Sequence, residues 1–236
     1  MPKDVIVACD FPTAEETLRF LDRFDGRRPF VKIGMELFYA AGPEIVKELR
    51  RRQHRIFLDL KLHDIPNTVA GGLCSLMGLG ADILNIHASG GYTMMKKSAE
   101  ALRAAAEKQG IACPKLIAVT VLTSINAEEW AEMGHTGDIG EQVIRLAELA
   151  KKAGLDGVVA SPQEAAAIRK ACGEDFLIVT PGIRPAGSSL DDQSRISTPS
   201  AALRNGATHL VVGRPVRSAE DPRAAAEKIV KEMGEA

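Results

Sequence analysis

The sequence of 236 residues lacks the features of membrane and nucleic-acid-binding proteins. No apolar run approaches the roughly 18–20 residues that span a bilayer. Lys and Arg total 30 against 31 Asp and Glu, so there is no basic excess of the kind that binds nucleic acid or anionic lipid. Aromatic residues make up only 4%, which disfavours a stacking surface for single-stranded nucleic acid. We therefore expect neither nucleic acid nor membrane as a partner.

Cysteine is also scarce, and no two cysteines form a Cys-x-x-Cys pair. The four are scattered, which fits neither a zinc site nor a disulfide framework. The first residues lead into a short apolar stretch that ends at Asp10, which is not the pattern of a secretory signal. These features predict a reducing, cytoplasmic environment.

What the sequence does contain is a regular alternation. Eight short apolar runs, rich in β-branched residues, are too short for helices and predict strands. They are Val5–Cys9, Phe30–Ile33, Arg55–Leu60, Asp82–Ile86, Lys115–Val121, Gly157–Ala160, Phe176–Thr180 and His209–Val212. Each is followed by a helix-like pattern, so the order predicts a parallel sheet. No linker or low-complexity segment divides the chain, and residues 1–236 are expected to form one domain.

Several helices carry their own start signals, in which a capping side chain precedes a proline or a glutamate. These signals lie at Thr13 with Glu16, Pro43, Asp138 with Glu141, Ser161-Pro162, Thr198-Pro199 and Asp221-Pro222. Helices over 67–79 and 93–109 are less sharply marked, and a short extra helix is expected over 127–133.

Eight units of roughly 28 residues fit a (β/α)₈ barrel of the α/β class, for which roughly 200–250 residues is usual. The alternative is an open, doubly wound sheet. That fold commonly places Gly-x-Gly-x-x-Gly after its first strand, whereas this sequence has Ala8-Cys9-Asp10-Phe11-Pro12 there. The barrel is therefore favoured.

Charged residues follow the ends of the first three predicted strands, where barrel active sites lie. Side chains alternate along a strand, so Asp59 and Lys61 should face the barrel axis. By the same alternation Lys32 and Asp10 point inward, and Asp64 follows just beyond. A buried structural ion network is the other interpretation, but it would carry a desolvation cost of several kcal/mol per charge.

The last two strands end in a pattern suited to an anion. Strand seven runs into Thr180-Pro181-Gly182-Ile183-Arg184, and strand eight ends in Gly213-Arg214. Loops at these positions commonly form the phosphate site of a barrel. Glycine lets the backbone approach an anion, and arginine offers paired hydrogen bonds to phosphate, although a Gly-Arg pair alone is a weak signal.

Taken together, these residues resemble the orotidine 5′-monophosphate decarboxylase family. The specific match is the ten-residue stretch Asp59-Leu60-Lys61-Leu62-His63-Asp64-Ile65-Pro66-Asn67-Thr68, the family's Asp-x-Lys-x-x-Asp signature with its extension. Supporting motifs occur in order over essentially the whole chain: Ala8-Cys9-Asp10, Val31-Lys32-Ile33-Gly34, Leu122-Thr123-Ser124, Thr180 to Arg184, Asp192-Gln193 and Val212-Gly213-Arg214.

The resemblance implies a reaction and a set of roles. The family converts orotidine 5′-monophosphate (OMP) to UMP, without metal or organic cofactor, in the last step of pyrimidine nucleotide synthesis. Lys61 would protonate C6 of the pyrimidine, and Asp59 would lie near the substrate carboxylate. Lys32 would orient Lys61 together with Asp64, which would act in the neighbouring subunit's site, so a homodimer is implied. The implied substrate contacts are Asp10, Lys32, Asp59, Ile65, Thr68 from the partner subunit, Thr123, Ser124, Arg184, Gln193 on a mobile 185–199 lid, Gly213 and Arg214.

Two alternatives stay open. Sugar-phosphate decarboxylases and hexulose-phosphate synthases share Asp-x-Lys-x-x-Asp but depend on Mg²⁺; Ile65 to Thr68 and Gln193 favour the nucleotide enzyme. A catalytically dead barrel that only binds nucleotides is disfavoured by the intact set of Lys32, Asp59, Lys61 and Asp64. His63 and His87 are assigned to packing or orientation rather than acid–base chemistry.

Overall fold

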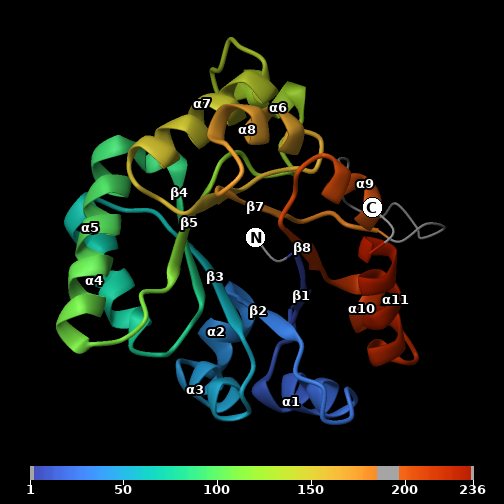
Figure 1. The fold of residues 1–236 in the computed structure, drawn as a ribbon. Coiled ribbons are helices and arrows are strands. Elements are labelled where there is room, and N and C mark those ends of the chain that lie inside the picture. Colours follow the sequence, from blue (N-terminus) through green and yellow to red (C-terminus); the bar gives the residue numbers. More distant parts are fainter. Residues whose placement is uncertain (1–2, 185–196, 235–236) are drawn as a thin grey trace.

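A computed structural model describes residues 3–184 and 197–234, and within them the chain forms a closed (β/α)₈ barrel (Figure 1). The parallel strands pair in chain order, and β8 returns to pair with β1. Their bounds are β1 Asp4–Ala8, β2 Phe30–Gly34, β3 Ile56–Leu62, β4 Ile83–His87, β5 Lys115–Val119, β6 Gly157–Val159, β7 Leu177–Thr180 and β8 His209–Val212. The predicted barrel is confirmed, and closure of β1 on β8 excludes the open sheet.

Helices surround the barrel on the outside (Figure 1). They are α1 Ala14–Asp22, α2 Met35–Ala41, α3 Glu44–Arg51, α4 Pro66–Met77, α5 Gly91–Gln109, α6 Ala127–Glu132, α7 Ile139–Lys152, α8 Ala165–Cys172, α9 Pro199–Arg204, α10 Arg214–Arg217 and α11 Pro222–Gly234, with a 3₁₀ turn η1 over Ala88–Gly90. The short helices α2 and α10 follow directly on β2 and β8 and were not expected from the sequence. None of the helices in these described segments is long and apolar enough to cross a membrane.

Most helix starts are confirmed by their capping bonds. Thr13 Oγ1 accepts from the backbone N–H of Glu16 at 3.2 Å, and Asp138 Oδ1 accepts from that of Glu141 at 3.0 Å. The prediction that Ser161 caps a helix was wrong. Its Oγ accepts from the N–H of Gln163 at 3.2 Å and so caps a turn, and helix α8 begins only at Ala165.

Pro43 also lies one position earlier than expected, because it precedes the first residue of α3 as its N-cap. The remaining proline starts, Thr198-Pro199 and Asp221-Pro222, do open helices α9 and α11. Thr198 Oγ1 accepts from the N–H of Ala201, and Asp221 Oδ1 accepts from that of Ala224.

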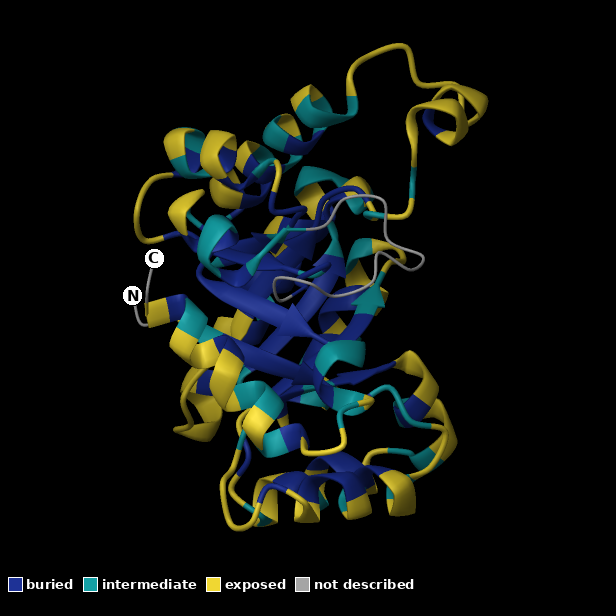
Figure 2. Ribbon diagram, turned by 90° about the vertical axis from the view of Figure 1, so that its right-hand side faces the viewer, coloured by how far each residue is buried: buried dark blue, intermediate teal, exposed yellow. Residues whose placement is uncertain are grey.

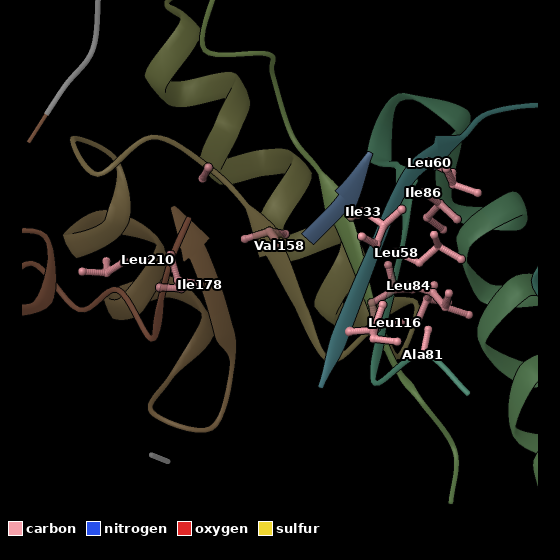
Figure 3. Packing of buried hydrophobic residues seen from close by; sticks show 14 of the residues in the cluster. Ile33, Leu58, Leu60, Ala81, Leu84, Ile86, Leu116, Val158, Ile178 and Leu210 are labelled. Atoms are coloured by element: carbon pink, nitrogen blue, oxygen red, sulfur yellow. The ribbon is translucent and has the colours of Figure 1, made fainter. Parts of the chain in front are cut away.

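The core has two layers, because strand side chains alternate between the barrel interior and the helices. Phe30, Phe57 and Ile6 belong to the inner cluster. Ile33 and Leu58 belong to the outer one, which Figure 3 shows between the strands and the surrounding helices. Figure 2 shows the buried strands at the centre with exposed helix faces around them. The predicted facing of β1, β2 and β3 is confirmed.

Strand β3 departs from regular geometry near its end. Its pairing with β4 shifts register between Leu58 and Leu62. Within this irregularity Lys61 has a φ of 51°, in the left-handed region that a non-glycine residue rarely adopts. Strained backbone of this kind persists only where surrounding contacts hold it.

Candidate active site

Four charged side chains from three neighbouring strands form one alternating chain at the carboxyl end of the barrel. Lys32 Nζ lies 2.9 Å from Asp10 Oδ1 and 3.4 Å from Asp59 Oδ2. Lys61 Nζ lies 2.7 Å from Asp59 Oδ1. The order Asp10, Lys32, Asp59, Lys61 therefore places each charge beside one of opposite sign, at the position that strand alternation predicts.

Lys32 and Asp59, the two middle members of this row of charges, stay ionised although they are largely shielded from solvent. Burial disfavours a charged Asp59, but the positive charges of Lys32 and Lys61 outweigh it, so the pKa of Asp59 is lowered. Burial likewise opposes the charge on Lys32, but the carboxylates of Asp59 and Asp10 more than compensate, so its pKa is raised. Paired in this way, both charges stay in place in a buried site, where electrostatic interactions are stronger than in bulk water.

Two neighbouring residues, which sequence reasoning missed, lie against this row of four charged side chains. Asn85 on β4 is buried, and its Nδ2 donates to Asp59 Oδ1 at 2.6 Å. Gly34 ends β2 where a Cβ atom would lie 3.1 Å from Lys32 Nζ and 3.4 Å from Asp10 Oδ1. Strand alternation puts Asn85 on the same face as His87 and could have found it, whereas nothing in the sequence marks the space beside Gly34.

A cavity of about 390 Å³ adjoins the charge chain and is rich in arginine. Arg184 from the segment after β7 and Arg214 from the start of α10 line it, together with Gly213. Arg217 lines it as well, stacks over the Phe11 ring at 5.6 Å and donates to the carbonyl oxygen of Asp10. This cavity joins the two segments in which the sequence predicted an anion site; Arg217 was not among the predicted residues.

A second, narrower cavity of about 170 Å³ lies over Asp59 and Lys61. Its other walls are mostly apolar, and Thr123 lines it as well. Lys32, Pro181 and Val211 line both cavities, so the two adjoin. The combined site offers arginines at one end and an apolar slot with an ion pair at the other.

The remaining predicted site residues are exposed outside the two cavities or fall outside the residues that the structure describes. Asp64 is exposed, and its Oδ1 accepts from the N–H of Ile65 at 2.6 Å; within the described residues it forms no ion pair with Lys32 or Lys61. Ile65 and Thr68 are exposed near it, and Ser124 is exposed beyond β5. Gln193, Asp192 and residues 185–196 of the predicted lid lie outside the described residues.

Two histidines stand beside the site. The rings of His63 and His87 lie 5.4 Å apart, centroid to centroid. Burial first, and then the nearby charges of His63 and Lys61, lower the pKa of His87. His87 is therefore neutral near pH 7, which agrees with an orienting rather than a charged role.

The fold and the site define the class: a (β/α)₈ barrel with a row of alternating charges at its strand ends, next to an arginine-lined cavity. Residues 3–229 match the family described as "Orotidine 5′-phosphate decarboxylase / HUMPS family", and the chain belongs to that family. Its carboxyl-end site is located where enzymes of this barrel class act.

Two curated relatives carry the name orotidine 5′-phosphate decarboxylase. The chain is 50% identical over 230 residues to the orotidine 5′-phosphate decarboxylase of Moorella thermoacetica, covering 97% of this chain and 91% of that protein. It is 52% identical over 221 residues to that of Cutibacterium acnes, covering 93% and 92%. A crystal structure of the Lactobacillus acidophilus decarboxylase superposes with a TM-score of 0.86 at 43% identity, covering 98% of this chain and 99% of that one.

Proposed function

We propose that this protein decarboxylates OMP to UMP in pyrimidine nucleotide synthesis. The observation that carries the proposal is the pair of adjoining cavities, one with three arginines and one with Asp59 and Lys61. A nucleoside monophosphate has matching ends, a phosphate for the arginines and a flat base for the narrow slot. The names of the relatives from Moorella and Cutibacterium support the same substrate.

The arginine end would hold the phosphate. A guanidinium group donates paired hydrogen bonds to phosphate oxygens, and Arg184, Arg214 and the Gly213 amide are the groups assigned to it. The ribose would lie against Asp10 and Lys32, which line this cavity; Lys32 lines the narrower one as well. Binding energy collected at the phosphate can then be used to hold the base in the narrower, more demanding slot.

The base would enter the slot with C6 facing Lys61, and Thr123 and Ser124 would read its polar edge. Cleavage of the C6–carboxylate bond releases CO₂ and leaves the electron pair on C6, in the ring plane. That pair cannot delocalise into the ring, so fixed charge must stabilise it. The Lys61 ammonium supplies this charge and then donates its proton to C6; the resulting amine recovers a proton from solvent.

Asp59 would face the carboxylate of the substrate. Two negative charges about 4 Å apart repel by roughly 4 kcal/mol at an effective dielectric constant near 20. Loss of neutral CO₂ relieves that repulsion. Because Lys32 and Lys61 keep Asp59 ionised despite its burial, the charge is in place before the substrate arrives.

We further propose that the working unit is a homodimer with shared sites. Asp64 and Thr68 are exposed rather than directed into their own site, as a role in a neighbouring subunit would require. Large apolar side chains near the ends of β2 and β3 are exposed as well: Met35 at 43%, Tyr39 at 72% and Ile65 at 66%. Exposed apolar patches of this kind commonly mark interaction sites.

A cytoplasmic location is also proposed. The four cysteines are free thiols, and Cys9 and Cys172 are buried. Burial first, and then the charge of Asp10, raise the pKa of Cys9 to about 12, so its thiol is unreactive at neutral pH. Free thiols of this kind are typical of reducing compartments.

The test is the fall in OMP absorbance after the purified protein is added, with and without a strong chelator. Turnover that is unchanged by the chelator is expected. The related Mg²⁺-dependent sugar-phosphate enzymes would lose their activity under chelation, because a metal stabilises their enediolate intermediate. Absence of OMP turnover, together with chelator-sensitive conversion of a sugar phosphate, would overturn the proposal in favour of those enzymes.

A further inference from the structure

Asn85 connects the two residues on which the proposed chemistry depends. Asn85 is the middle residue of strand β4, and it is buried, with 2% exposed. Its Oδ1 accepts from the backbone N–H of Lys61 at 2.8 Å, while its Nδ2 donates to Asp59 Oδ1 at 2.6 Å. One amide group therefore touches both the main chain of Lys61 and the carboxylate that binds the Lys61 ammonium.

The contact to Lys61 falls at the strained point of strand β3. The pairing of β3 with β4 passes from Leu58–Leu84 to Leu62–Ile86, which leaves Asn85 without a backbone partner on β3. Lys61, with its φ of 51°, turns its N–H to the Asn85 side chain instead. A buried N–H that lost this acceptor would carry a desolvation penalty, so the amide stabilises the left-handed conformation.

The contact to Asp59 matters when Lys61 acts. Asp59 Oδ1 has two donors, Lys61 Nζ at 2.7 Å and Asn85 Nδ2 at 2.6 Å. In the proposed reaction the Lys61 ammonium turns from Asp59 to C6 and gives up a proton. Asn85, together with Lys32 on the other oxygen, then still holds the carboxylate in place.

An amide meets both requirements at neutral pH. A backbone N–H can only donate, and an ionised carboxylate can only accept, so the connecting group must accept at one end and donate at the other. This also fixes the orientation of the amide. Leucine can do neither, and an ionised aspartate would accept from Lys61 but repel Asp59.

We propose that Asn85 is a positioning residue for decarboxylation, holding the main chain of Lys61 and the carboxylate of Asp59 in reactive geometry. The inference rests on the proposed function and adds a residue to it. Asn85 contacts Asp59 and Lys61 from β3. Lys32 from β2 binds the other oxygen of Asp59, and His87, two residues later on β4, lies against His63. A new ionisable group at position 85 would thus meet a negative charge at Asp59.

The experiment compares Asn85→Leu and Asn85→Asp with the wild-type enzyme, measuring kcat for OMP and the dissociation constant of UMP. Both variants are expected to lose about 100-fold in kcat, the scale of a misplacement of about 1 Å. UMP, held at its phosphate, should bind within about tenfold of its wild-type affinity. Thr208→Val is the matched control. It removes a buried hydroxyl that bonds the backbone of Ile178 at the opposite end of the barrel, and its kcat should be unchanged.

The pH profile separates positioning from mere loss of packing. Asp59 and burial raise the pKa of the new carboxyl group in Asn85→Asp. Protonated, that group can donate to Asp59; ionised, it repels it. The kcat of Asn85→Asp relative to wild type should therefore rise as pH falls, whereas the ratio for Asn85→Leu should stay flat.

Two results would overturn the inference: wild-type kcat in Asn85→Leu, or equal and pH-independent losses in both variants. If Asn85→Leu does not fold, as judged by near-UV circular dichroism, the pH profile of the isosteric Asn85→Asp decides alone. Wild-type enzyme that fails to turn over OMP would refute the proposed function instead, so the two failures are distinguishable.

Discussion

The ammonium nitrogen of Lys61 lies 2.7 Å from Oδ1 of Asp59, two residues earlier on the same strand. On a regular strand such residues share a face but stand well apart along the chain. The left-handed conformation of Lys61 and the register shift beside it accompany the close contact seen here. The proposed proton donor is therefore paired with the group expected to face the substrate carboxylate.

Removing the charge of Asp59 while keeping its shape tests its electrostatic role. Asp59→Asn should lower kcat by about 100-fold or more, the scale seen when one preorganised electrostatic group is removed. UMP has no carboxylate, so its affinity should change little. Steady-state kinetics with OMP and titration with UMP measure the two effects; equal losses in both would point to a general collapse of the site.

The pH dependence should follow from the two shifted groups. Asp59 stabilises the fold in its ionised form above its ordinary pKa of 3.8, and this is lost as pH falls through the lowered value. Lys32 stabilises the fold in its charged form below its ordinary pKa of 10.5, and this stabilisation is lost as pH rises through its raised pKa. From about pH 5 to about pH 9 both groups should stay charged and add no inflection to kcat/KM.

Lys32→Met removes the largest electrostatic stabilisation of ionised Asp59 but leaves its burial. The acidic limb of the pH–rate profile should therefore move to higher pH. The exposed Lys47→Met, whose partner is Glu44 on the surface, serves as control and should leave the profile in place. If the acidic limb of the profile does not move in Lys32→Met, Lys32 does not stabilise ionised Asp59 as described.

Gly34→Ala places a methyl group 3.1 Å from Lys32 Nζ. We expect the ammonium to shift, its contact with Asp10 to lengthen, and kcat/KM to fall roughly 10-fold or more, since small misplacements in a site are costly. Gly234→Ala is a suitable control because nothing lies within 4 Å of its added Cβ. The measurement is kcat/KM of both variants, with thermal unfolding to confirm that they fold. Equal kcat/KM in the two variants would contradict the expectation.

Shared sites can be tested by mixing inactive variants. One subunit with Asp64→Ala and one with Lys61→Ala should regain one working site per mixed dimer, since the first keeps its Lys61 and receives Asp64 from the second. The measurement is OMP turnover after the two are unfolded and refolded together. No recovery above the separately refolded variants would show that each site uses its own Asp64.

Much of the fold and part of the site could be predicted from the sequence. Strand alternation placed Asp10, Lys32, Asp59 and Lys61 on one inward surface because period-two facing is a local property. The strand order followed from eight repeated units, and β8 was predicted to the residue.

The rest depended on tertiary structure. The left-handed Lys61 arises where two strands fall out of register, and no local pattern around Lys61 signals it. Asn85 matters because it lies opposite that point, 24 residues away along the chain. Ser161-Pro162 has the local pattern of a helix start, yet the helix begins later, at Ala165.

In the proposed reaction Lys61 carries out the chemistry, and the arginine-lined cavity provides the binding. The most direct measurement is OMP turnover and UMP affinity in Lys61→Ala beside the wild type. The expected result is a loss of turnover of at least about 1,000-fold, since both a proton donor and a fixed charge are removed, with UMP still bound. Undiminished turnover in Lys61→Ala would contradict this division of roles.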